Sequence, residues 1–248
     1  MTNLLRDTDD VLRKLKEIVQ LFNSMPEIGM TVRDILYKLN YTDKDLVRLS
    51  NNRGLRGGIC EKIMFGKWND NRKQSDFLDY GFEGDQKVGV IKKLKSNKIS
   101  TPDTLKITHF NNNDLFKYDE ELLWDMSSLR KKCSVLFMPI FSFEGKGKLL
   151  DSRLLGGYHY ILGDDDLERI KREFIDIVYD AKKQIELYGR MKSTTARRKH
   201  LQIRTSGQGK NKRAKDSQKA YSWYLTISCL RDVIYTKLPE NITSLLDN

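Results

Sequence analysis

The sequence predicts a mixed α/β (α+β) fold, and three observations support this prediction. Apolar residues recur at helical spacing through roughly the first sixty positions, strand-like segments fill the middle of the chain, and one long amphipathic helix precedes the last strands. With 248 residues, 39% hydrophobic and 32% charged, the chain can bury a substantial core. This order of segments favours a central mixed sheet flanked by helices.

Short helices are expected at the N-terminal end. Apolar spacing predicts helices within 11–22 and 32–39, and a further helix near 59–65 that follows a glycine-containing entry. Thr31 and Thr42 stand where N-caps would be, each with an aspartate three residues later. Because such pairs satisfy the first free backbone N–H groups of a helix, they predict where two helices begin.

Strands and one long helix account for most of the remaining chain. The strand-like segments are "QKVGVIKKL", "TLKITHF", "SVLFMPIFSF", "LGGYHYIL", "LQIRT" and "KAYSWYLTISCL". Between the fourth and fifth, the run 164–188 carries a single apolar stripe, with three aspartates at its start and Gly189 after its end. A helix N-terminus explains these aspartates more simply than a metal site does.

The positive charge is concentrated in one segment. The formal net charge is +11, and the segment 190–219 holds eleven Lys or Arg residues, among them Lys210, Lys212 and Arg213, against one acid, Asp216. A solvated face or a localisation signal is the ordinary explanation of such a run. Here a strand leads into the glycine-containing part of the run, an arrangement that favours a phosphate-binding surface and therefore nucleic acid.

Composition also limits the compartment and the class of protein. The three cysteines, Cys60, Cys133 and Cys229, lie far apart, which argues against a disulfide framework and against a zinc site. No apolar stretch is long enough to span a bilayer, and the first residues lack the apolar core of a secretory signal. We therefore expect a cytoplasmic protein without membrane contact.

One short stretch has the residue types of a metal-dependent nuclease. In "SDFLDYGFEGDQKVGVIKK", Asp76 and Asp85 can hold a hard cation, and Lys87 can orient water or offset developing charge. Residues two apart on a strand point to the same side, so Asp85 and Lys87 should share a face. A carboxylate-x-lysine triplet occurs three times in this chain, so the three residues can also be ordinary charges on a hairpin.

Five stretches in order give the chain a resemblance to a known family. They are "GGICEKIMFG", "DFLDYGFEGDQK", "KKLKSNKISTPDTLKITHF", "LRKKCSVLFMPIF", and "RRKHLQIRTSGQGKNK" followed by "KAYSWYLTISCL". In this order they resemble the MutH mismatch-repair endonuclease and the GATC-cleaving type II restriction enzymes related to it. The resemblance covers most of the chain, roughly residues 45 to 234.

The resemblance implies a restriction-endonuclease-like core, with two lobes around a DNA cleft and a Mg²⁺ cofactor. By position, Asp76 and Asp85 would be the metal ligands and Lys87 the catalytic lysine. Glu61 would be the supporting helix carboxylate, and Lys131 a second active-site lysine. On this view residues 1–248 form one domain, with a catalytic lobe to about 145 and a DNA-recognition lobe from about 146.

The resemblance also suggests residues that contact DNA. Arg204 and Tyr221 fall on positions that touch bases in the family, and an arginine fork can bind guanine O6 and N7 together. Lys210, Lys212 and Arg213 would lie in the same DNA-binding loop. Ser206 stands where the family can carry a lysine, which leaves the exact sequence preference open.

The register of the site leaves one alternative open. Asp85 stands where the family usually has glutamate, and the spacing from Asp76 is two residues longer than usual. An ungapped alignment would pair Asp76 with Glu83 and place Asp85 in the lysine position, which would be an inactive site. The gapped register is preferred because it keeps "KKLKSNK" aligned and because loops absorb insertions.

The function expected is Mg²⁺-dependent hydrolysis of double-stranded DNA at a short palindromic site, with GATC as the first choice. Restriction is preferred to mismatch-repair nicking, because the match through "KKLKSNKIS" is closer to the restriction members. Two alternatives stay open: a catalytically silent, DNA-binding copy of the fold, and a basic protein without sequence preference. The sequence leaves open a homodimer on DNA and a companion DNA methyltransferase acting on the same site.

Overall fold

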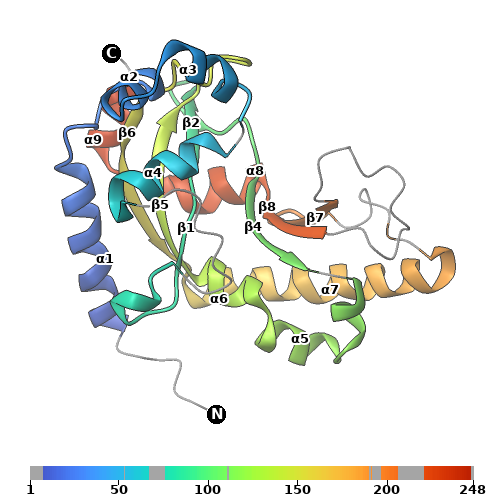
Figure 1. Cartoon of the computed structure of the whole chain (residues 1–248). Coiled ribbons are helices and arrows are strands. Elements are labelled where there is room, and N and C mark those ends of the chain that lie inside the picture. Colours follow the sequence, from blue (N-terminus) through green and yellow to red (C-terminus); the bar gives the residue numbers. More distant parts are fainter. Residues whose placement is uncertain are drawn as a thin grey trace. The chain divides into compact units, whose positions relative to one another are not determined.

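The computed structural model consists of two compact units, and Figure 1 shows the elements of the chain. The structure describes residues 8–52, 54–66, 76–110, 112–189, 191, 197–205 and 221–246. The first unit comprises Met1–Pro102, Leu136–Tyr160 and Tyr235–Asn248, and the second comprises Asp103–Val135 and Ile161–Ile234. The predicted lobe boundary near residue 145 falls inside the first unit. The mixed α/β class is confirmed, because helices accompany one mixed and one antiparallel sheet.

The helices predicted at the N-terminal end of the first unit are confirmed. They are α1 (Thr8–Asn23), α2 (Val32–Lys38), α3 (Asp43–Leu49) and α4 (Leu55–Phe65). Thr31 and Thr42 form full capping boxes with the aspartates three residues later, as predicted. Helix α4 begins four residues earlier than its predicted core and ends at Gly66, whose left-handed backbone (φ 68°) suits glycine.

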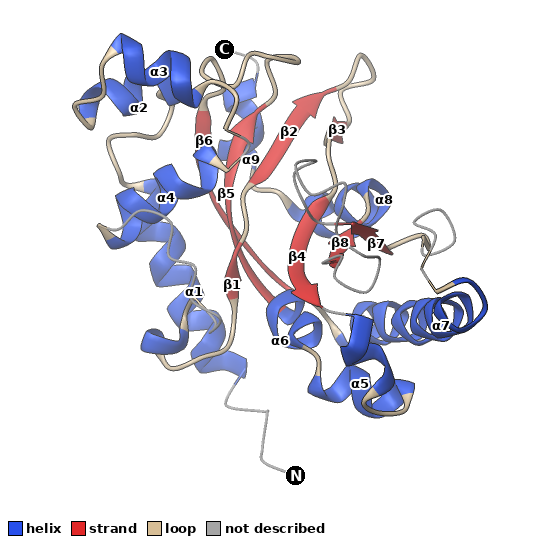
Figure 2. Ribbon diagram, turned by 45° about the vertical axis from the view of Figure 1, so that its right-hand side comes forward, coloured by secondary structure: helices blue, strands red, loops and turns tan. Residues whose placement is uncertain are grey.

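The first sheet is built on β5 (Val135–Ser142), whose residues after Val135 are all buried, and Figure 2 shows the strands of this sheet. Its strands are β1 (Asp85–Gln86), β2 (Gly89–Lys93), β3 (Ile99–Ser100), β5 (Val135–Ser142) and β6 (Leu154–Ile161). Both β1 and β2 run parallel to β5 in the same register, with Asp85 opposite Leu136 and Gly89 opposite Ile140. The chain from 85 to 93 is therefore one extended line along β5. Strand β3 pairs with β2, and β6 pairs with β5.

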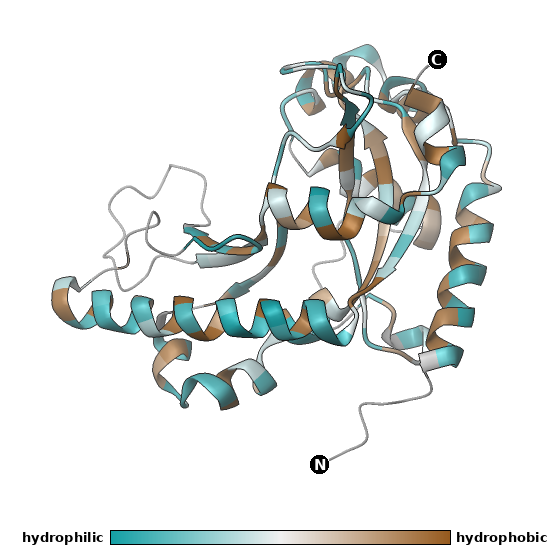
Figure 3. Cartoon of the chain, turned by 180° about the vertical axis from the view of Figure 1, so that it is seen from behind, coloured by the Kyte–Doolittle hydropathy of each residue, from teal (hydrophilic) through white to brown (hydrophobic). Residues whose placement is uncertain are grey.

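Close packing of α1 against β6 explains the glycine at position 157. A Cβ at Gly157 would lie 2.8 Å from a ring carbon of Phe22 and 3.0 Å from the ring of Phe137. These two rings meet edge to face at 5.3 Å between centroids. The Asn23 side chain donates to the Gly157 carbonyl at 3.2 Å and accepts from its N–H at 2.5 Å. In Figure 3 the strands of this sheet are largely hydrophobic.

The chain closes with short helical turns. They are η4 (Leu230–Ile234), a π-helical turn in the second unit, and η5 (Tyr235–Lys237), α9 (Glu240–Thr243) and η6 (Ser244–Leu246) in the first. Ile234, Tyr235 and Ile242 are buried, so this end of the chain contributes core residues.

The second unit combines an antiparallel sheet with a long helix. The sheet has the order β4 (Leu105–Phe110), β8 (Tyr221–Leu225), β7 (Leu201–Thr205). The helices are α5 (Glu120–Met126), α6 (Ser128–Ser134), α7 (Asp164–Tyr188) and α8 (Ile227–Cys229), with a 3-10 turn η2 (Asn112–Phe116). The long helix is confirmed with the bounds expected, and Figure 3 shows its mixed hydropathy.

One predicted strand is shorter than expected. The sequence "KAYSWYLTISCL" was expected to be extended throughout, but β8 ends at Leu225 and Ile227–Cys229 are helical. The reason is Thr226, whose hydroxyl accepts from the Cys229 N–H at 3.1 Å and caps a new helix. The apolar and β-branched composition of this segment does not by itself predict that the strand ends at Leu225.

The cysteines behave as small core residues. Cys60, Cys133 and Cys229 are all buried and unbridged, as predicted. Burial raises the pKa of the Cys133 thiol to about 12. Among the described helices, none is both long and apolar enough to cross a membrane.

Candidate active site

The structure brings Asp76, Asp85 and Lys87 together in the first unit. The Asp76 carboxylate accepts from the backbone N–H of Gln86 at 2.7 Å, which ties the turn before β1 to that strand. Lys87 Nζ donates to the Asp85 carboxylate and, at 3.2 Å, to the Gln86 carbonyl. The Lys87 N–H donates to the Phe137 carbonyl at 2.9 Å, so the ladder to β5 continues past β1. Two carboxylates and one ammonium group therefore meet at one point of the sheet.

Aromatic packing holds the turn that carries Asp76. Phe77 is fully buried and stacks on Phe82, with ring centroids 5.3 Å apart and planes 8° apart. Its ring also meets Phe137 of β5 edge to face at 6.1 Å and Phe65 of α4 at 6.5 Å. Because Phe77 follows Asp76 directly, this cluster fixes the direction from which the carboxylate approaches the strand.

Asp85 is an ionisable side chain in an apolar sheet. It is 1% exposed, and Lys87 is 19% exposed at its side chain. Burial raises the pKa of Asp85 to about 6; the Lys87 charge opposes this, while the hydrogen bond with Asp76 and the charge of Asp76 add to it. Two close carboxylates disfavour full ionisation of both unless a cation lies between them.

The donor set fits Mg²⁺ by its chemistry. Carboxylate and carbonyl oxygens are the ligands this ion prefers, and it commonly keeps several waters with one or two protein carboxylates. Asp76, Asp85 and the Gln86 carbonyl supply such oxygens within one hydrogen-bonded cluster. In the described part of the chain no group of three or more His, Cys, Asp or Glu side chains could hold a metal, so a cation here would have two carboxylates, with the Gln86 carbonyl as a further oxygen close by.

The other candidate catalytic residues lie on separate elements. Glu61 is half-buried on α4, where its charge contributes to the raised pKa of the neighbouring Cys60 thiol, after the larger effect of burial. Glu83 lies in the loop before β1, outside the paired strand. Asp76 shares a hydrogen bond with Asp85, the pair that the gapped register expects, and the choice of register stays a prediction. Lys131 is exposed on α6, in the second unit.

Arg204 belongs to a polar row across the second sheet. Arg204 of β7 and His109 of β4 both lie directly opposite Ser222 of β8, so the three residues share one face. Arg204 is exposed, and its guanidinium lies 5.4 Å from the ring centre of Tyr224, which stands two residues along the same face. Ser222 Oγ lies 2.9 Å from His109 Nδ1. An exposed arginine supported in this way is available to a partner.

His109 connects this row to a lysine. Its Nε2 lies 2.8 Å from Nζ of Lys106, and burial, followed by the Lys106 charge, lowers the pKa of the imidazole. A neutral ring that accepts from Lys106 at Nε2 carries its proton on Nδ1 and can donate it to Ser222. Sequence reasoning missed Ser222, Tyr224 and His109, although counting by twos from Arg204 across paired strands would have found them.

Tyr221 lies on the opposite, apolar face. It is 2% exposed, pairs with Phe110 at 5.9 Å between ring centroids, and shares its face with Trp223. Trp223 in turn packs on Phe174 of α7 at 4.8 Å. The aromatic side chain beside Arg204 is the half-buried Tyr224, and Tyr221 supports the strand from behind. Lys210, Lys212 and Arg213, the other predicted DNA contacts, lie outside the described residues.

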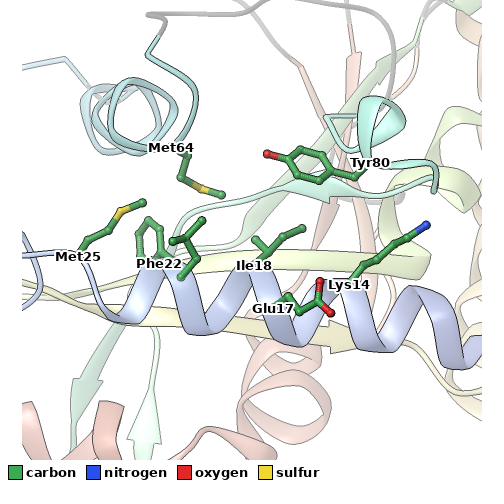
Figure 4. A pocket seen from close by; sticks show the side chains of 8 residues that line it. Lys14, Glu17, Ile18, Phe22, Met25, Met64 and Tyr80 are labelled. Carbon is green, nitrogen blue, oxygen red and sulfur yellow. The ribbon is translucent and has the colours of Figure 1, made fainter.

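A pocket of about 270 Å³ lies elsewhere in the first unit (Figure 4). It is lined by Ile18 and Phe22 of α1, Met25 just after that helix, Met64 of α4, and Tyr80. These side chains are apolar or aromatic, and Lys14 and Glu17 stand at its edge. None of the predicted catalytic residues lines this pocket.

The chain was compared with protein-family models and with curated proteins. No protein-family model matches the chain, and no curated protein matches it. Any functional conclusion therefore rests on the geometry of the site and on the motifs of the sequence.

Proposed function

We propose that the protein is a Mg²⁺-dependent endonuclease of double-stranded DNA, with a restriction-endonuclease-like core. The observation that carries the proposal is the meeting of Asp76, Asp85 and Lys87 at a buried strand. Burial of an aspartate costs free energy, and a second carboxylate beside it adds to that cost. A bound cation would offset this cost, whereas a structural ion pair between Asp85 and Lys87 would not need the second carboxylate of Asp76.

Each residue has a distinct part in the proposed hydrolysis. Asp76 and Asp85 would hold the cation, and the hydrogen bond from the Gln86 N–H to Asp76 keeps the first carboxylate close to the second. When bound, Mg²⁺ polarises the phosphoryl oxygen and lowers the pKa of bound water. Lys87 places a positive charge beside the scissile phosphate, where it orients the attacking water and offsets the negative charge of the transition state. Glu61 and Lys131 are proposed as supporting residues.

Arg204 is proposed to read a base. The arginine fork matches guanine O6 and N7, and stacking on Tyr224 limits its conformations. The +11 net charge supports duplex DNA as the partner, since neutralised phosphates release counterions. Together with the resemblance of the motifs, this makes a short palindromic site, first GATC, the proposed target, with Mg²⁺ as the cofactor.

Restriction of foreign DNA in the cytoplasm is proposed as the biological role. Cutting both strands of a palindrome would be served by two copies on one site, because a two-fold symmetric site matches a two-fold symmetric dimer. A DNA methyltransferase acting on the same site would protect the host. Mismatch-repair nicking uses the same chemistry but leaves one strand intact.

Plasmid cleavage tests the proposal. Incubation with Mg²⁺ should convert unmethylated plasmid to linear fragments, and sequencing should place every end at GATC. Parallel plasmid methylated at the GATC adenine shows whether methylation protects. Nicked circles alone would indicate the repair activity instead. Tight binding with no cut in Mg²⁺ or Mn²⁺ would contradict the proposed activity and favour a silent DNA-binding module.

A further inference from the structure

The hairpin that joins β2 to β3 carries an unusual concentration of lysines. We define the lysine hairpin as residues 92–98, "KKLKSNK", which hold four lysines and no acid. Two backbone hydrogen bonds close its turn: the Leu94 N–H donates to the Lys98 carbonyl at 2.9 Å, and the Asn97 N–H donates to the Leu94 carbonyl at 2.9 Å. Asn97 adopts φ 60°, a left-handed backbone that asparagine tolerates.

A second lysine-bearing turn lies beside the hairpin. The Phe143 N–H donates to the Ile91 carbonyl at 2.8 Å, and Lys92 Nζ lies 5.8 Å from the centre of the Phe143 ring. The turn that follows Phe143 adds Lys146 and Lys148, both exposed. The two turns together bring six lysines into one part of the first unit, with Glu144 as the acid within them.

Lys95 and Lys98 of the hairpin differ from several described lysines elsewhere, whose charges are neutralised by ion pairs. Lys38, Lys117 and Lys182 each pair with a glutamate or aspartate at 2.6–2.9 Å. Within the described residues, Lys95 and Lys98 are exposed and make no ion pair. Ammonium groups without an ion-pair partner on a hydrogen-bonded turn attract polyanions. Lysines that served only to solvate the surface would not need such a turn.

The position of the hairpin relative to Lys87 indicates which polyanion it meets. The chain is extended from Asp85 to Lys93, and Lys95 follows Lys87 by eight residues, at most about 26 Å along the strand. A four-base-pair site is only about 14 Å long at 3.4 Å per base pair. A duplex bound with its cut at Lys87 therefore has flanking phosphates within reach of the hairpin.

We propose that the lysine hairpin binds backbone phosphates of the DNA that flanks the recognition site. The contact rests on the proposed nuclease function, and it makes affinity depend on the length of the duplex without contributing to base choice. Phosphate contacts position a protein and carry no sequence information of their own.

Binding without cleavage tests this contact. Affinities in EDTA are measured for a 12-base-pair and a 28-base-pair duplex, each with one central GATC, over a range of salt. The native chain should prefer the longer duplex. Lys95→Ala with Lys98→Ala should bind both equally and lower the salt slope of log affinity by about 1.8, at about 0.9 for each lost phosphate contact.

Two control variants separate the hairpin from charge in general. Lys95→Arg with Lys98→Arg keeps the charge and should behave as the native chain. Lys16→Ala with Lys44→Ala removes two other exposed lysines, on α1 and α3, and should keep the length preference. An alanine hairpin variant that retains the native slope and length preference overturns the inference. Failure of the native chain to bind either duplex would instead contradict the proposed function.

Discussion

The two sheets of the molecule differ in where they place charged side chains. In the antiparallel sheet of the second unit, Arg204, Ser222 and His109 share one face, while Tyr221 and Trp223 share the other. The first sheet instead keeps Asp85 almost fully buried beside apolar neighbours along β5. A separated face is what a stable two-sided sheet requires. A buried carboxylate is a departure from that requirement, and departures of this kind concentrate at functional sites.

Replacement of the buried carboxylate of Asp85 should have the largest effect among these tests. At pH 7.5 and saturating Mg²⁺, about 100 times the dissociation constant, the native fold should gain about 2.7 kcal/mol of unfolding free energy. Asp85→Asn should lose this gain. Differential scanning fluorimetry with and without Mg²⁺ measures both, and Asp165→Asn at the start of α7 is the matched control.

The same assay has a predicted pH dependence. The folded pKa of Asp85 is raised to about 6, so below that pH the folded chain holds a proton where the cation would bind. The Mg²⁺-dependent shift in melting temperature should therefore shrink between pH 7.5 and pH 5. A shift that is as large at pH 5, or that survives in Asp85→Asn, would place the cation elsewhere.

Packing on β6 offers a test that involves no charge. Gly157→Ala should destabilise the first unit by about 1–3 kcal/mol, because its Cβ would press on the rings of Phe22 and Phe137. Gly57→Ala in α4 is the matched control. Its Cβ has space, with the nearest atom 4.0 Å away on Val88, and a helical alanine should stabilise by about 0.5–1 kcal/mol. Urea denaturation of both variants would show equal effects if the packing account were wrong.

The two faces of the second sheet predict a division of roles. Arg204→Ala should cost about 1–3 kcal/mol of discrimination between GATC and a site with its guanine replaced. Tyr221→Phe should leave that discrimination unchanged, since Tyr221 is stacked on Phe110. Competition binding with both duplexes gives the numbers. An equal loss on both sequences in Arg204→Ala would make this residue a phosphate contact.

Much of the fold was predictable because its signals are local. Capping pairs at Thr31 and Thr42 and the stripe along α7 depend on neighbours a few residues apart, and both were confirmed. The end of β8 was not predicted, because the capping hydroxyl of Thr226 competes with a run of β-forming residues. The division of the chain into two units was also not predicted, because each unit consists of segments that lie far apart in the sequence.

The candidate site was only partly predictable for the same reason. Alternation along a strand predicted that Asp85 and Lys87 would share a face. The approach of Asp76 depends instead on the burial of Phe77 among the rings of Phe65, Phe82 and Phe137, which are distant from one another in the sequence or outside regular elements. The placement of Tyr221 behind the sheet depends on the pairing register with β4 and β7, which one strand does not reveal. Tertiary pairing therefore decided which aromatic stands beside Arg204.

Cleavage by the Lys87→Ala variant is the most direct test of the account. A duplex with one GATC is held at saturating protein and Mg²⁺, and single-turnover cutting is compared with duplex affinity in EDTA. The account predicts that cutting falls by at least about 10²–10³-fold while affinity changes little, because the lysine acts on the transition state. Native cutting rates in Lys87→Ala, with intact binding, would contradict the assignment of Asp76, Asp85 and Lys87 as the catalytic site.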